Sequence, residues 1–153
     1  MTTLTEVQTT QVYQVLIKAS PEAIWDAITK PEFTTRYFFG SAVDTTAEVG
    51  SPWRGWTADH AQPLVDGQVL EADPPRRLQH SWRALYDDET AREPYSRVTW
   101  EIEPQDGGCS KLTVVHDQLE QSPKTAESVA GGWMYVLSGL KTLLETGESL
   151  ATR

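Results

Sequence analysis

The residues best able to do acid–base or ligand-orienting chemistry are two histidines in strand-like segments. His80 lies on the same side of an alternating segment as Leu78 and Trp82, and His116 lies on the same side of another as Leu112 and Val114. If the apolar side of each segment is buried, both imidazoles point inward, where they can orient a ligand oxygen or accept a proton. The alternative is a core histidine satisfied by a neighbouring backbone or tyrosine oxygen. Both are therefore candidate ligand-binding residues.

Tryptophan supplies the second group of candidates. The chain has six tryptophans, and five of them fall in strand-like or helical segments: Trp53, Trp56, Trp82, Trp100 and Trp133. Large flat rings pack imperfectly and each buried indole N–H needs a partner, so such a set favours a cavity that takes up water or a ligand. Core packing is the competing explanation for any one of them. As a set they predict an aromatic pocket.

No other residues combine into a recognisable reactive site. His60 follows Asp59 in a loop and is expected at the surface, and no histidines or cysteines have zinc spacing. Cys109 follows two glycines, and nothing near it in the sequence would activate its thiol. The sequence contains no nucleophile elbow, phosphate-binding loop or dinucleotide fingerprint. We therefore expect no metal, no cofactor and no catalytic residues that the sequence can assign, and binding is favoured over catalysis.

Size and charge limit the class of protein. At 153 residues the chain fits one domain, which we place at residues 10–150 with flexible ends at 1–9 and 151–153. With 13 basic and 22 acidic residues the net charge is −9, which disfavours nucleic acid and anionic membranes as partners. A single cysteine excludes an intrachain disulfide, and we find neither a secretory signal nor an apolar run of about 20 residues. We expect a cytoplasmic protein.

The elements that must position the candidates begin with a strand and a capped helix. The run 12–18 is rich in β-branched and aromatic residues, which is typical of a strand. Ser20 as N-cap and Pro21 at the first helical position mark a helix start, and this helix should end before Pro31. A second short helical turn is expected over residues 31–37.

Strand patterns dominate the middle of the chain. Short extended runs are separated by turn residues, and an Asp-Gly turn joins the last two as a hairpin. The clearest runs are 52–56, 67–72, 78–84, 97–102 and 111–116. Strands that follow one another through short turns predict an antiparallel sheet.

The last long segment reads as an amphipathic helix from Pro123 to about Gly147. Its apolar residues recur at spacings of three and four, and glycine is a typical helix stop. The stripe expected to face the sheet and a ligand is Trp133, Val136, Leu137 and Leu140. These elements predict an α+β domain in which a curved antiparallel sheet wraps around the long helix and leaves a gap at one end.

Two further segments have alternative interpretations. The aromatic run 37–40, which contains Phe38, is either a mobile lid over the cavity mouth or a permanent hydrophobic plug. The turn 73–77 either carries two solvated arginines, Arg76 and Arg77, or uses them to bind an acidic partner. The candidate ligand-binding residues are Phe38, Trp53, His80, Trp82, Trp100, His116, Trp133, Val136, Leu137 and Leu140.

Four segments, 17–33, 67–82, 98–104 and 131–147, resemble the bacterial homologues of the activator of heat-shock-protein-90 ATPase. The resemblance runs from about Val12 to Glu148. It implies the helix-grip fold of the START-like (SRPBCC) superfamily, with two short N-terminal helices before the curved sheet and a long C-terminal helix. It also implies a hydrophobic ligand held between sheet and helix, and no shared catalytic residues.

Three functions remain open at this point. The leading hypothesis is a protein that binds a small hydrophobic molecule, aromatic or lipid-like, between the sheet and the C-terminal helix without catalysis. The second is a co-chaperone-like module that binds the heat-shock-protein-90 chaperone and stimulates its ATPase. The third is a polyketide cyclase-like enzyme in which an inward histidine serves as general base.

Overall fold

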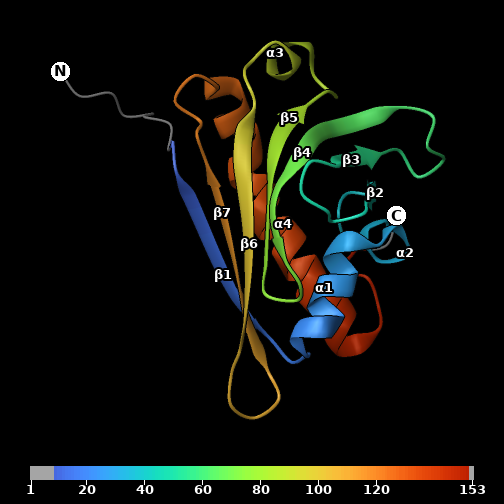
Figure 1. The fold of residues 1–153 in the computed structure, drawn as a ribbon. Helices are drawn as coiled ribbons and strands as arrows, with labels where there is room; N and C mark the ends of the chain where they lie inside the picture. The colour runs from blue at the N-terminus through green and yellow to red at the C-terminus, as the bar shows by residue number, and fades with distance from the viewer. Residues whose placement is uncertain (1–8, 152–153) are drawn as a thin grey trace.

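The computed structural model describes residues 9–151, which form seven strands and four helices (Figure 1). In chain order these are β1 (Gln11–Ile17), α1 (Pro21–Thr29), α2 (Pro31–Thr34), β2 (Ala42–Thr45), β3 (Pro52–Trp56), β4 (Pro63–Asp73), β5 (Arg77–Ala84), α3 (Asp88–Ala91), β6 (Ser96–Pro104), β7 (Ser110–Asp117) and α4 (Pro123–Thr146). The predicted flexible ends, 1–9 and 151–153, lie almost entirely outside the described residues.

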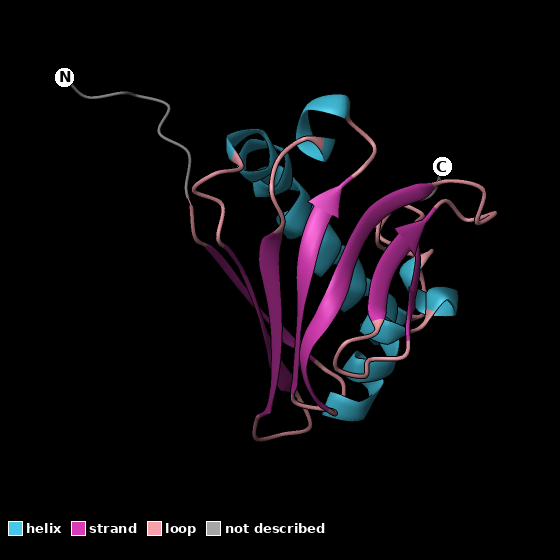
Figure 2. Ribbon diagram, turned by 45° about the horizontal axis from the view of Figure 1, so that its top comes forward, coloured by secondary structure: helices cyan, strands magenta, loops and turns pink. Residues whose placement is uncertain are grey.

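The strands form one antiparallel sheet in the order β1-β7-β6-β5-β4-β3-β2. Figure 2 shows the sheet curving over one side of α4, with α1 and α2 near one end of that helix. The α+β class and the helix-grip arrangement expected from the sequence are therefore confirmed. No helix within residues 9–151 is both long enough and apolar enough to cross a membrane.

Helix α1 begins and ends where its sequence signals predict. Ser20 Oγ accepts a hydrogen bond of 3.1 Å from the backbone N–H of Ala23. Pro21 lies in the first turn, where backbone N–H groups have no intrahelical partner, so its missing N–H costs no hydrogen bond. The helix ends at Thr29 because Lys30, which precedes a proline, is extended. This helix packs against α2, α4 and the strands β2 and β6.

The register of the central strands places the two candidate histidines on one face of the sheet. His80 of β5 pairs with Val98 of β6, which in turn pairs with His116 of β7. Opposed residues on antiparallel strands point to the same face, and so do residues two apart along one strand. Trp82, two residues after His80, and Trp100, two residues after Val98, therefore share this face. All five side chains are buried, so this is the face turned toward α4.

The opposite face of the sheet carries ion pairs. Arg97 bonds both oxygens of Asp117, at 2.9 and 2.6 Å. Arg83 bonds both oxygens of Asp66, at 3.2 and 3.1 Å. Such partly exposed pairs contribute about 1 kcal/mol or less each. Their main consequence is that one face of the sheet is charged while the other is apolar, which fixes the side on which α4 packs.

Helix α4 presents the predicted stripe to the sheet. Trp133, Val136, Leu137 and Leu140 are all buried. The helix stops at Gly147, whose φ of 80° lies in the left-handed region that glycine adopts without strain. Both its start after Ser122 and its stop therefore agree with the sequence pattern.

Candidate functional site

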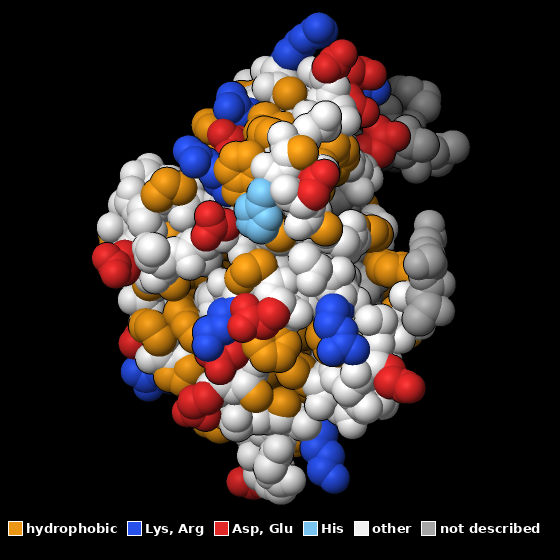
Figure 3. Space-filling view, turned by 90° about the vertical axis from the view of Figure 1, so that its right-hand side faces the viewer, with side chains coloured by type: hydrophobic (Ala, Val, Ile, Leu, Met, Phe, Trp, Pro, Cys, Tyr) orange, Lys and Arg blue, Asp and Glu red, His pale blue; other side chains and the backbone are white. Residues whose placement is uncertain are grey.

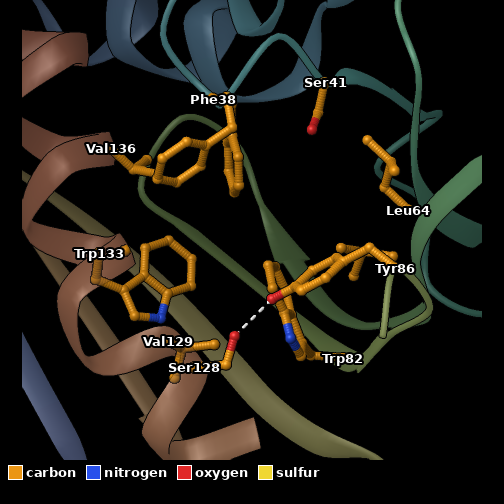
Figure 4. Close-up of a pocket in the computed structure, with 12 residues that line it drawn as sticks. Phe38, Ser41, Leu64, Trp82, Tyr86, Ser128, Val129, Trp133 and Val136 are labelled. Carbon is orange, nitrogen blue, oxygen red and sulfur yellow. Dashed lines mark hydrogen bonds between the residues drawn. The ribbon is translucent and has the colours of Figure 1, made fainter. Parts of the chain in front are cut away.

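A cavity of about 370 Å³ opens between the sheet, α4 and the segment after α2. Figure 4 shows its side chains surrounding a central space, with Trp133 and Val136 on the α4 side and Leu64 and Tyr86 opposite them. The lining residues are Phe38, Phe39, Ser41, Leu64, Val65, Trp82, Tyr86, Ser128, Val129, Gly132, Trp133 and Val136. Small-molecule sites usually measure about 300–1,000 Å³, so the cavity has the size of a binding site.

Three aromatic rings from separate parts of the chain form one wall. Phe38 stacks on Trp82 of β5, with centroids 6.3 Å apart, and meets Trp133 of α4 edge-on at 5.9 Å. The two indoles are 5.6 Å apart and tilted by 48°. Because the rings are not coplanar, they present both faces and edges to the space, which suits contact with another flat ring.

The polar groups of the cavity lie on side chains that carry no charge. Tyr86, in the loop after β5, and Ser128 of α4 share a 2.8 Å hydrogen bond across the opening, drawn as a dashed line in Figure 4. Tyr86 is 53% exposed, so this bond lies at the mouth. Ser41 adds one more hydroxyl. The lining has no charged residue, so an ionised ligand group would lose its hydration without gaining an opposite charge.

His80 lies beneath the cavity wall and does not line the cavity. Its Nδ1–H donates to the carbonyl oxygen of Ser81 at 2.9 Å, and its Nε2 accepts from the indole N–H of Trp100 at 3.0 Å. Its ring also stacks on Trp53, with centroids 3.8 Å apart. Both nitrogens are therefore occupied within the protein, as in the alternative of a satisfied core histidine.

His116 is held in a similar way by a second tryptophan. Its Nδ1 accepts from the indole N–H of Trp133 at 2.9 Å. An indole N–H can only donate, so the ring proton lies on Nε2 and donates to Ser96 Oγ at 2.7 Å. Thus Trp133 lines the cavity with its ring while its N–H anchors it to the sheet through His116.

Burial keeps both histidines neutral. Desolvation lowers the pKa of His80 to about 3, and the nearby His116 adds to this effect. Desolvation likewise lowers the pKa of His116 to about 3. Protonation would also turn each accepting nitrogen into a donor facing an indole N–H. These residues are therefore hydrogen-bond anchors for Trp100 and Trp133.

The neutral histidines lead to a pH-dependent stability. Unfolded histidines take up protons near pH 6.5, whereas the folded ones do so only near pH 3, so the unfolded chain binds more protons between these values. The free energy of unfolding should therefore fall as the pH falls, by about 2 kcal/mol between pH 6.5 and 5.5 for the two groups together. Urea denaturation at pH 7.5, 6.5 and 5.5 measures this change. The control is His60→Asn, which removes an exposed imidazole and keeps both buried ones, so its stability should still fall as the pH falls; a flat profile in the unsubstituted chain would contradict the assignment.

The structure brings four of the ten candidate residues to the cavity and leaves six behind its wall. Those that line it are Phe38, Trp82, Trp133 and Val136. Those that are buried without lining it are Trp53, His80, Trp100, His116, Leu137 and Leu140. The lining is thus richer in residues of α4 and of the loops than the sequence patterns indicated.

Several lining residues escaped the sequence analysis. Val129 belongs to the same helical stripe as Trp133, so the spacing of apolar residues could have included it. Leu64 and Val65 begin β4 ahead of the run 67–72 that the pattern marks. Tyr86 and Ser128 reach the mouth from a loop and an exposed helix position, for which the sequence gives no signal.

A model of the family described as activator of Hsp90 ATPase homolog 1-like protein matches residues 18–145. The chain belongs to this family. The resemblance inferred from four sequence segments is thereby confirmed, over nearly the same span. A comparison with curated proteins gave no match.

Solved structures share the fold of this family member at low identity. A protein from Mesorhizobium loti is 23% identical, with a TM-score of 0.71 over 89% of this chain and 96% of its own. An HSP90 activator from Plasmodium falciparum is 20% identical, with a TM-score of 0.73 over 90% and 97%. The Aha1 dimer from Colwellia psychrerythraea is 17% identical, with a TM-score of 0.72 over 93% and 100%. At these identities the likeness establishes the helix-grip fold.

Among residues 9–151, no three histidine, cysteine, aspartate or glutamate side chains are grouped so as to hold a metal ion. The site described above consists instead of aromatic, aliphatic and hydroxyl groups. Such a set can bind and orient an apolar molecule by contact and by one or two hydrogen bonds.

Proposed function

We propose that this family member binds a small, uncharged, apolar molecule in the cavity between the sheet and α4. The observation that carries the proposal is the lining itself, in which five aromatic and several aliphatic side chains surround about 370 Å³ without a charged group. An apolar cavity of about 150 Å³ accommodates one benzene ring, so this volume suits a ligand of about two to three rings.

The expected affinity follows from the area that such a ligand buries. Removing about 200–300 Å² of apolar surface from water contributes about 5–8 kcal/mol. Association costs reduce this gain, but the rings are already held by their own packing, and Trp133 is also held by its hydrogen bond to His116. Binding in the micromolar range is therefore expected.

A neutral three-ring fluorophore, N-phenyl-1-naphthylamine, tests the proposal by fluorescence titration. We expect saturable binding at one site. Ser128→Trp places a large side chain at the cavity mouth from an exposed helix position and should weaken binding at least ten-fold. The matched control is Glu127→Trp, one residue away and outside the lining, which should bind like the unsubstituted chain. Equal binding by both variants, or none by the parent, would sink the proposal.

The family description and the Plasmodium falciparum neighbour support a second candidate, binding to the chaperone Hsp90. Its basic contact was expected at Arg76 and Arg77. Arg76 bonds Asp73 at 3.2 Å, while Arg77 bonds Glu71 at 2.8 Å and Glu101 at 3.2 Å. An acidic partner would have to displace these carboxylates, at a cost of about 1 kcal/mol or less for each exposed pair.

We expect the chain to leave the ATPase turnover of Hsp90 unchanged, because the uncharged cavity supports the binding of a small molecule as its function. Steady-state ATP hydrolysis measured with increasing amounts of the chain is the direct test. A saturable stimulation that is lost in Arg76→Glu/Arg77→Glu and weakens with salt would reverse the order of the two candidates.

The third hypothesis, a cyclase-like enzyme, has less support. It requires a general base within reach of a bound substrate. The described cavity lining has no histidine, carboxylate or lysine, and both nitrogens of His80 and His116 are engaged elsewhere. Binding without a general base is therefore the function that the site supports best.

A further inference from the structure

A second cavity, of about 690 Å³, lies beside the first along α4. Its lining residues are Thr35, Arg36, Tyr37, Phe39, Gly40, Tyr135, Gly139, Ser149, Leu150 and Ala151. Phe39 is the one described residue that lines both spaces. On the helix, Gly132 of the first cavity is three residues from Tyr135 of the second, and such residues are neighbours on a helix surface. The two cavities are therefore adjacent and separated by the Phe39 side chain.

Phe39 lies over α4, next to Tyr135 and Gly132. Its ring stacks on Tyr135, with centroids 5.3 Å apart and planes inclined by 17°. It also lies close to Gly132, where a Cβ atom would come within 3.7 Å of Phe39 Cε2. The ring is nevertheless 62% exposed. It thus acts as a wall between the cavities without being part of the buried core.

The backbone at Phe39 is unusual for a large residue. Its φ is 52°, and Gly40 follows with a φ of 74°, so two successive residues are left-handed. Glycine adopts this region freely, but a bulky side chain there is strained. A strained position held by the fold indicates that the ring orientation matters for the adjacent site. Figure 3 shows hydrophobic side chains in clusters among charged ones on the face that it draws.

We propose that Phe39 sets the length of the ligand by closing one end of the first cavity. This inference rests on the proposed function and adds a class of ligand to it: uncharged molecules with a linear alkyl chain. Without the ring, a chain would run over Gly132 into the second cavity, where the rings of Tyr37 and Tyr135 offer apolar surface. With the ring in place, only chains that fit the first cavity are fully buried.

The test is displacement of N-phenyl-1-naphthylamine by 1-alkanols from hexanol to dodecanol. In the parent chain, affinity should rise about four-fold per methylene while the chain fills the first cavity, and then level off. In Phe39→Gly, which suits the left-handed backbone, the rise should continue, so that the ratio of dodecanol affinity to hexanol affinity is at least ten-fold larger than in the parent. Phe39→Ala should give the same result. Because alanine adds less backbone freedom than glycine, agreement between the two variants assigns the effect to loss of the ring.

The outcomes separate this inference from the function on which it rests. The control Leu16→Ala removes an exposed side chain of β1 that lines neither cavity. Its alkanol affinity should level off at the same chain length as that of the parent. If both Phe39 variants fold, as judged by circular dichroism, and level off at the parent's chain length, the role of Phe39 is refuted while ligand binding stands. If the parent binds neither the fluorophore nor any alkanol, both proposals fall.

Discussion

Replacing Gly67 with alanine is expected to destabilise the fold by about 3 kcal/mol or more. A Cβ atom at this position of β4 would lie 1.9 Å from the carbonyl oxygen of Ser81 and 2.7 Å from its carbon. These are main-chain atoms of β5 and cannot rotate away, so the two strands would have to separate. The hydrogen bond from the N–H of Gln68 to Ser81 Oγ, 2.9 Å long, would be strained as well.

The matched control for this substitution is Gly55→Ala on β3. There a Cβ atom would meet Val65 and Ser41 side-chain carbons at 3.8 and 3.9 Å, which is ordinary contact. Its stability should change by less than about 1 kcal/mol. Urea denaturation of both variants gives the comparison. Equal stabilities would show that β4 and β5 approach less closely at Gly67 than the structure has them.

His80→Phe should cost about 3 kcal/mol of stability. Phenylalanine can stack on Trp53 as the imidazole does, but it leaves the indole N–H of Trp100 and the carbonyl of Ser81 without their hydrogen bonds. Each unpaired buried group costs about 1–3 kcal/mol. Chemical denaturation measures the loss.

The same variant separates the two interpretations of His80. Because the imidazole does not line the cavity, fluorophore affinity per folded molecule should stay within about two-fold of the parent. A variant of parental stability that has lost affinity for ligands with a polar head would instead place His80 in contact with the ligand. That outcome would restore the interpretation drawn from strand alternation alone.

Local signals in the sequence were sufficient to predict most of the elements. The cap at Ser20, the hairpin before β7 and the stop at Gly147 each depend on a few adjacent residues, so they can be recognised without tertiary information. The four-residue elements β2 and α3 were missed because they are too short for a periodic pattern. Every residue of β2 pairs with a residue of β3, and this pairing depends on tertiary contact.

The candidate site was predictable only in part, for a physical reason. Alternation along β5 determines that His80 faces inward, and the structure agrees. Alternation does not determine whether the imidazole reaches the cavity. The register of β5 against β6 brings Trp100 alongside His80, and the indole N–H occupies the imidazole nitrogen that a ligand would use. The mouth was likewise beyond reach, since Tyr86 and Ser128 are 42 positions apart in the chain.

The most direct measurement of ligand binding in the cavity follows the indole N–H signals in ¹⁵N-edited NMR during titration with N-phenyl-1-naphthylamine. Trp82 and Trp133 line the cavity, whereas Trp25 and Trp56 do not. Binding in the cavity should shift the Trp82 and Trp133 signals saturably with one common dissociation constant, while the Trp25 and Trp56 signals stay in place. An absence of saturable shifts at Trp82 and Trp133, or shifts confined to Trp25 and Trp56, would contradict it.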